Sequence, residues 1–165
     1  MTNLTNFCTA IQHSPHEEKT EQADCKAIKF DDSDGFVESL TANYANSCRV
    51  DYFEVIEDGL IMIELKRIKL KIQNLLRQGK TKKDIRNKVL TNIAKKFQKS
   101  LSIIQSEINP DLIPTINYLV VDNDIESVIL DKYLPNNLRE EPFVICKTNE
   151  ICDKLSKFDT RLCPE

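Results

Sequence analysis

The chain has no tryptophan, only three glycines and only two histidines among its 165 residues. With so few aromatic side chains, surfaces on which unpaired bases stack are sparse. Both histidines, His13 and His16, lie near the N-terminus, so a histidine-based nucleophilic triad would have to recruit one from there, and acyl-transfer chemistry is not expected. Apolar runs fall short of the roughly 18 residues of a membrane-spanning helix, and a basic-then-apolar signal pattern is missing. These absences favour a cytoplasmic protein with no membrane partner.

The six cysteines stand in a chain without an export signal, so we expect reduced and mostly buried thiols. Cys8, His13, His16 and Cys25 include the side-chain types that bind Zn²⁺ tetrahedrally, but their spacing matches no strong zinc pattern. A flexible arm with incidental histidines and buried cysteines is the alternative, and the spacing favours it.

The composition is typical of one globular domain, with 41% hydrophobic and 30% charged residues in 19.0 kDa. We expect a polar N-terminal arm over residues 1–24 and a single α/β domain over 25–165, with a mixed central sheet flanked by helices. This order follows from β-rich runs that alternate with helical periodicity. The expected strands are 25–30, 49–57, 60–66, 115–121 and 142–147, and the expected helices are 36–45, 68–76, 81–108, 124–134 and 150–158.

The runs 49–57 and 60–66 flank Asp58-Gly59, a strong hairpin signal because a type I′ turn needs positive φ at both loop positions. A two-residue loop there sets Asp51 opposite Lys66, with Asp51 diagonal to Glu64 at roughly 7 Å between their β-carbons. Since strand side chains alternate between faces, these three residues share one face. Two carboxylates at that separation can share one divalent cation.

Carboxylate oxygens are hard ligands that suit Mg²⁺ or Mn²⁺, and either ion can activate a water molecule and neutralise charge on a scissile phosphate. The Lys66 ammonium, two residues after Glu64, can orient the attacking water or stabilise the transition state. Asp51, Glu64 and Lys66 are therefore chemically sufficient for phosphodiester hydrolysis. The alternative is an exposed hairpin face with a cross-strand Asp51/Lys66 pair worth a few tenths of a kcal/mol.

Asp51, twelve intervening residues and Glu64-Leu65-Lys66 resemble the PD-(D/E)xK motif of restriction-endonuclease-like nucleases. In that family the motif lies on a strand hairpin within an α-β-β-β-α-β core, and the similarity covers residues 36–121. The resemblance implies that Asp51 and Glu64 bind the metal, that the Leu65 carbonyl is a further ligand, and that Lys66 is catalytic.

The resemblance also implies an accessory acid on the helix before the hairpin, and Glu38 is the acid so placed. The chain departs from the family pattern in two respects. Val50 stands where the family often has proline, and only one strand is clear before the strand of Asp51.

The segment from Lys66 to Lys99 holds 13 Lys and Arg and one acid, Asp84. It carries a formal charge of +12, so the rest of the chain carries −15 against a total of −3. Repulsion between like charges along a helix is relieved by an anionic partner, and a nucleic-acid backbone is one. The alternative is a solvated face paired with acidic segments elsewhere. The residues expected to contact nucleic acid are Lys69, Gln73, Lys80, Lys82, Lys83 and Arg86.

The interpretation we favour is a metal-dependent nuclease that hydrolyses DNA or RNA with Mg²⁺ or Mn²⁺. One alternative is a noncatalytic nucleic-acid-binding or regulatory protein of a defence system or mobile element that retains a nuclease-like fold. Another is an ordinary α/β interaction domain in which the motif residues arise by chance. A homodimer or a larger protein partner is compatible with a chain of this size.

Overall fold

The computed structural model describes residues 3–13, 21–45, 47–57 and 59–164, which form a six-stranded sheet in the order β1-β2-β3-β4-β5-β6. Strands β1 to β4 pair antiparallel, whereas β4, β5 and β6 are parallel. The expected single α/β domain with a mixed central sheet is confirmed. The strands are β1 (Cys8–Gln12), β2 (Gln22–Lys29), β3 (Tyr52–Ile56), β4 (Gly59–Lys66), β5 (Pro114–Val121) and β6 (Phe143–Lys147).

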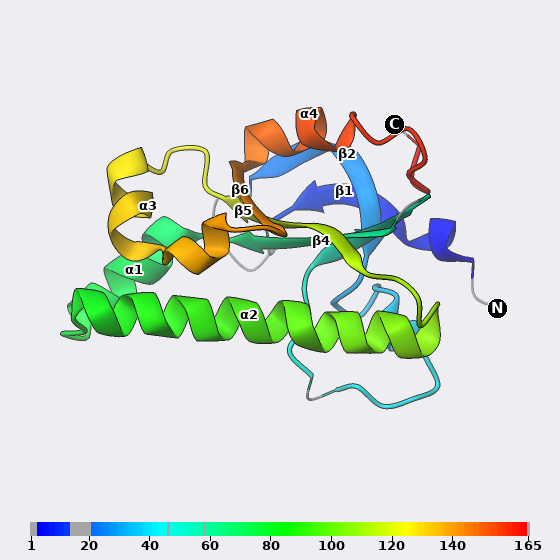
Figure 1. Cartoon of the computed structure of the whole chain (residues 1–165), viewed down its shortest axis with the longest axis horizontal. Coiled ribbons are helices and arrows are strands. Elements are labelled where there is room, and N and C mark those ends of the chain that lie inside the picture. Colours follow the sequence, from blue (N-terminus) through cyan, green and yellow to red (C-terminus); the bar gives the residue numbers. More distant parts are fainter. Residues whose placement is uncertain (1–2, 14–20, 46, 58, 165) are drawn as a thin grey trace.

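Helices cover both faces of the sheet (Figure 1). α1 (Ile68–Arg77) and α2 (Lys82–Glu107) connect β4 to the parallel β5, and α2 runs along one face. α3 (Ser127–Tyr133) connects β5 to β6, and α4 (Ile151–Leu155) lies on the face opposite α2. The short 3₁₀ helices are η1 (Leu4–Phe7), η2 (Val37–Ser39), η3 (Asn136–Arg139) and η4 (Thr148–Glu150).

α2 begins where the sequence predicts because Thr81 caps it. The Asp84 N–H donates to the Thr81 hydroxyl at 3.2 Å, and the Thr81 N–H donates to the Asp84 carboxylate at 3.3 Å. Apolar residues at steps of three and four then bury one side of the helix. These residues include Ile85, Val89, Ile93, Phe97 and Ile104. Among the described residues, no helix is both long and apolar enough to cross a membrane.

Strand β4 is buried on both faces, as expected of a strand next to a parallel neighbour. Leu60 and Met62 pack in the core that contains the apolar side of α2, whereas Ile61, Ile63 and Leu65 pack in the core beneath α4. Since side chains alternate, Glu64 points to the α2 side, and it is only 1% exposed. A carboxylate therefore stands inside the domain, where it requires compensation.

The helix expected over 36–45 is wrong, because only the 3₁₀ helix Val37–Ser39 forms among residues 36–45 that the structure describes. The Ser39 hydroxyl donates to the Phe36 carbonyl at 2.6 Å, and the Leu40 N–H bonds to Val37 instead. Serine thus competes for the carbonyl that an α-helix would use. Burial of Phe36, whose ring lies 5.8 Å from that of Phe7, determines the local path of the chain.

The described part of the arm expected over residues 1–24 supplies β1 and the start of β2, so these residues belong to the sheet. The cysteines hold this region to the C-terminal segment through two disulfides, Cys8–Cys163 and Cys25–Cys152. The expectation of reduced thiols is therefore wrong for these four, while Cys48 and Cys146 are free.

A zinc site made of Cys8, His13, His16 and Cys25 is also wrong, because Cys8 and Cys25 are each bonded to another cysteine. His16 lies outside the described residues. Disulfides persist in oxidising compartments, so cysteine chemistry no longer supports a cytoplasmic location, which stays a prediction.

Removal of the Cys25–Cys152 disulfide should destabilise the fold, because these cysteines are 127 residues apart and their link restricts the unfolded chain. We expect the double variant Cys25→Ser/Cys152→Ser to lose about 2–5 kcal/mol of unfolding free energy in urea denaturation. Cys48→Ser, which alters a free and half-buried thiol, is the control and should change stability little. Equal stability of the double variant and the wild type would contradict this disulfide.

A second buried carboxylate, Glu54 on β3, packs against Arg161 with an Nη1–Oε2 distance of 3.5 Å. Burial raises the pKa of Glu54 to about 7, and Arg161 and the Cys163 N–H only partly oppose the shift. Folding therefore takes up a proton between about pH 4.5 and pH 7. The contribution of Glu54 to stability is most favourable below pH 4.5 and falls as the pH rises through this window.

Glu54→Gln should consequently gain stability relative to the wild type as the pH rises from 5 to 8. The difference in unfolding free energy between Glu54→Gln and the wild type should change by up to about 3 kcal/mol over this range, because one pKa unit corresponds to about 1.4 kcal/mol. Urea denaturation of both proteins across this range measures the difference, which isolates Glu54 since all other titrating groups are shared. Parallel stability curves would refute the assignment.

Candidate metal and phosphate site

The β3-β4 hairpin brings Asp51 and Glu64 closer than the sequence predicts. Ile56 pairs with Gly59 and Tyr52 pairs with Ile63, so the register differs by two residues from the one expected. Asp51 precedes Tyr52, and its N–H donates to the Ile63 carbonyl at 3.1 Å, which sets Asp51 opposite Glu64. Directly opposite residues have β-carbons about 4.5–5.5 Å apart. A shift of two preserves the face, so the expectation that the two carboxylates share one face is retained.

The register differs because Gly59 belongs to β4 and not to the turn. Its φ is +156°, and a β-carbon there would lie 2.3 Å from the Thr115 hydroxyl oxygen. Glycine is thus required for the close approach of β5. The other residue of the predicted loop, Asp58, lies outside the described residues.

Asp51 and Glu64 line a pocket of about 390 Å³, which we call the carboxylate pocket. Its lining comes from the ends of β1 and β4, the turn after β2, and helices α1 and α2. Acidic and basic side chains are both concentrated there, which is the composition needed to hold a cation next to a phosphate. The acids are Asp31, Asp32, Asp51 and Glu64, and the basic side chains are Lys29, Lys66, Arg67, Lys71 and Lys96.

Backbone contacts hold Asp51 in the wall of this pocket. Its Oδ2 accepts a hydrogen bond from the Leu65 N–H at 2.8 Å, and α2 fixes the preceding residue because the Val50 N–H donates to the buried Ser100 hydroxyl at 2.8 Å. Burial raises the pKa of Asp51 to about 6, although the Leu65 N–H and Lys96 oppose the shift. The aspartate therefore gains from an additional cation.

Glu64 is compensated by a lysine from α2. The Lys96 ammonium lies 2.5 Å from Glu64 Oε1. Burial lowers the pKa of Lys96, but Glu64, Asp51 and Asp31 together raise it above its ordinary value. Burial and the adjacent Asp51 nevertheless hold the pKa of Glu64 well above its usual value. One cation is therefore insufficient for the two neighbouring carboxylates.

The second oxygen of Glu64 identifies a place for a further ligand. Oε2 is buried and has no hydrogen-bond partner among the described residues. A buried acceptor without a partner costs about 1–3 kcal/mol, so such atoms call for an explanation. A divalent cation bound between Glu64 Oε2 and Asp51 supplies one, and the all-oxygen donor set fits Mg²⁺ or Mn²⁺.

Lys66 emerges from β4 on the same face as Glu64, as predicted, and it lines the carboxylate pocket. Its Nζ donates to Asn92 Oδ1 of α2 at 3.4 Å. Burial and repulsion from Lys96 lower the pKa of Lys66, and attraction to Glu64 only partly opposes this. An ammonium with a lowered pKa gives up its proton more readily than a lysine in water.

Glu38 does not belong with these residues. It follows Val37 in η2, its side chain is 47% exposed, and it pairs with Arg49 at 3.5 Å while lining a separate surface hollow. The accessory position is wrong because the helix that was to carry Glu38 does not form. Asp31 lines the carboxylate pocket in its place and accepts from Arg49 Nε at 2.9 Å.

The residues expected to contact nucleic acid are distributed over several surfaces. Lys69 is engaged by Asp124 at 3.4 Å, and its N–H donates to Asp122 at 3.2 Å. Arg86 donates to the carbonyls of Asp131 and Lys132 at the end of α3. Lys80 lines a second pocket, beside α2. Gln73, Lys82 and Lys83 are exposed.

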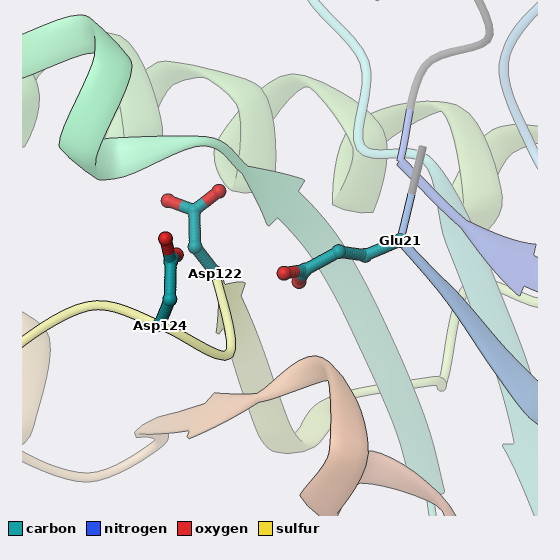
Figure 2. A group of neighbouring side chains, drawn as sticks. All are labelled: Glu21, Asp122 and Asp124. Carbon is teal, nitrogen blue, oxygen red and sulfur yellow. The ribbon is translucent and has the colours of Figure 1, made fainter. Parts of the chain in front are cut away.

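A second acidic cluster lies where β2 begins and β5 ends. Figure 2 shows Glu21 pointing toward Asp122 and Asp124. One carboxylate oxygen from each residue lies within 4.8 Å of the others. These three are close enough to share a metal ion. However, Arg67 Nε and the Lys69 N–H donate hydrogen bonds to Asp122, and the Asn123 N–H and the Thr148 hydroxyl donate to Glu21. Protein donors therefore already bind two of the three acids of this cluster.

The carboxylate pocket also contains Lys71, Asn74, Lys96 and Asp31, which the sequence did not predict there. One signal for Lys96 was present: it lies between Ile93, Phe97 and Ser100, at the margin of the buried side of α2. A lysine in that position directs its ammonium to the sheet, where a buried carboxylate then needs it. Comparisons of the chain with protein-family models, with curated proteins and with solved structures gave no match.

Proposed function

We propose that the chain is a metal-dependent nuclease in which Asp51 and Glu64 bind Mg²⁺ or Mn²⁺. The observation that carries this proposal is the buried Glu64 Oε2, which lacks a partner among the described residues and stands beside a second carboxylate in a pocket with basic walls. Carboxylate pairs of this kind attract a divalent cation, and the surrounding lysines attract an anionic substrate.

When bound, the ion supplies Lewis acidity and an activated water for attack on phosphorus. The chain's own residues prepare the remainder of the site. The Leu65 N–H and Lys96 orient the two carboxylates before any ligand arrives, so little reorganisation is needed. Lys66, with its lowered pKa, can hold a proton at a phosphate oxygen and release it to the leaving group.

Topology supports the proposal in part. Strands β2, β3 and β4 form an antiparallel meander, and helices α1 and α2 lead to the parallel β5. This order agrees with the β-β-β-α-β part of the core that the PD-(D/E)xK resemblance implies. The leading helix of that core has no counterpart among the described residues before β2, where η1 is the only helical turn.

A noncatalytic nucleic-acid-binding protein is the second candidate, and one observation favours it. Lys96 already sits on Glu64 Oε1, so an internal cation occupies part of the space that a metal ion needs. In that case the pocket would bind phosphate through its lysines without hydrolysing it.

The test is cleavage of labelled DNA and RNA in the presence of Mn²⁺. We expect turnover by the wild type and a loss of at least about 10²-fold in both Asp51→Asn and Lys66→Ala, since each removes a group that acts in the transition state. Glu38→Gln is the matched control, because Glu38 lies outside the pocket, and it should retain activity. Cleavage unchanged in Asp51→Asn would refute the proposal, and binding without turnover would favour the second candidate.

A further inference from the structure

A second pocket lies along α2, and one of its lining residues is hydrogen-bonded to a residue of the carboxylate pocket. This lysine pocket has a volume of about 560 Å³ and is formed by Cys48 together with one side of α2. Asn92 lines it and accepts a hydrogen bond from Lys66 of the carboxylate pocket, and Lys95 in one pocket is followed by Lys96 in the other. The hydrogen bond between Lys66 and Asn92 therefore links the linings of the two pockets. Besides Cys48, the lysine pocket is lined by Lys80, which precedes α2, and by Asp84, Asn87, Lys88, Thr91, Asn92 and Lys95 of α2.

The chemistry of the lysine pocket suits phosphate groups. Three lysines, Lys80, Lys88 and Lys95, line it against a single acid, Asp84, and that acid is already used to cap α2. No aromatic side chain lines it among the described residues. A ligand there is held through its charge and not by stacking of bases.

The carboxylate pocket limits the shape of that ligand. Glu64 is 1% exposed, and the lining comes from several separate segments of the chain, so a phosphate must enter the pocket to approach Glu64. Duplex DNA resists sharp local bending, so moving one of its phosphates into this pocket has a deformation cost. A single strand turns freely at each nucleotide.

We propose that the substrate is a single-stranded polynucleotide, which places one phosphate in the carboxylate pocket and continues past Asn92 along α2 into the lysine pocket. This inference rests on the proposed function for the reaction at Asp51 and Glu64. The strand is gripped by its backbone, so binding depends strongly on salt and little on base identity.

Helix geometry supplies a matched control. At 100° per residue, Lys88 and Lys95 lie within about 20° of each other around α2, whereas Lys82 and Lys83 lie more than about 100° away from Lys88. Lys82 and Lys83 are exposed and do not line the lysine pocket. The double variants Lys88→Glu/Lys95→Glu and Lys82→Glu/Lys83→Glu change the net charge equally but at different places.

The first experiment measures fluorescence anisotropy of labelled oligothymidine in EDTA, as a 20-mer single strand and as a duplex with oligoadenosine. We expect the single strand to bind at least about 10-fold more tightly, and Lys88→Glu/Lys95→Glu to weaken it at least about 10-fold, against less than about 3-fold for Lys82→Glu/Lys83→Glu. Equal affinity for the duplex, or equal losses in the two double variants, would overturn the inference.

The second experiment uses Cys48 as a reporter inside the lysine pocket. It is a half-buried free thiol, Cys146 is buried, and the other four cysteines are paired, so N-ethylmaleimide should modify Cys48 first. Saturating oligothymidine should slow this reaction at least about fivefold through contact with phosphates along α2. An unchanged rate would show that the strand takes another path. Neither experiment involves cleavage. If the protein gives the expected result in both but does not cleave, the nuclease proposal is refuted while the proposed binding path is supported.

Discussion

Glu64→Gln should reduce Mn²⁺-dependent cleavage by at least about 10²- to 10³-fold, the loss typical of removing one electrostatic contact to the transition state. The amide keeps the size of the side chain but replaces one carboxylate oxygen by an NH₂ group that cannot bind a cation. Oε2 has no hydrogen-bond partner among the described residues, but the neutral amide leaves the Lys96 ammonium without its charge partner. The variant must therefore be shown to be folded before the loss of activity is assigned to the missing metal.

Thermal unfolding separates these two causes. Mn²⁺ at about 100 times its dissociation constant should stabilise the wild type by about 2.7 kcal/mol and should not stabilise Glu64→Gln. In EDTA both proteins should unfold cooperatively. Glu57→Gln, at an exposed acid near the other end of the same hairpin, should behave as the wild type. Normal cleavage by Glu64→Gln would contradict the assignment of this residue.

Lys96→Met should destabilise the metal-free protein by about 3–5 kcal/mol, because removal of one partner leaves the other charge buried without compensation. Glu64 is 1% exposed, and among the described residues Lys96 is bonded to its Oε1 while its Oε2 has no partner. Removal of Lys96 therefore leaves this buried carboxylate without its nearest cation. Lys99→Met alters an exposed lysine three residues further along α2 and should change stability by less than about 0.5 kcal/mol.

Mn²⁺ should restore part of that loss. Because the ion provides the positive charge that Lys96 provided, it should raise the unfolding temperature of Lys96→Met by more than that of the wild type. Differential scanning fluorimetry over a Mn²⁺ titration measures both shifts. Identical shifts would mean that Lys96 and the metal act at unrelated places.

The candidate site was largely readable from local sequence, because its central carboxylates lie on one hairpin. Alternation along two paired strands fixes which side chains share a face, and a register error of two residues leaves that result intact. The error itself came from Gly59, which fits a hairpin turn in the sequence but serves the close approach of Thr115 on β5. Such a contact between distant segments leaves no local signal.

Other features depended on pairings across the whole chain. Cys8 and Cys163 are 155 residues apart, and disulfide connectivity cannot be deduced from spacing. The helix expected over 36–45 gave way to burial of Phe36, as tertiary packing commonly overrides local propensity. Because that helix does not form, Glu38 does not reach the carboxylate pocket. Asp31, which lies in a turn, lines the pocket together with Asp51.

Crystals soaked in Mn²⁺ test the central claim most directly, since anomalous scattering locates the ion without reference to activity. The account predicts a Mn²⁺ ion bound by Asp51 and Glu64, with Lys96 displaced from Oε1 or retained beside it. A Mn²⁺ ion at Glu21, Asp122 and Asp124 with none between Asp51 and Glu64 would contradict the account.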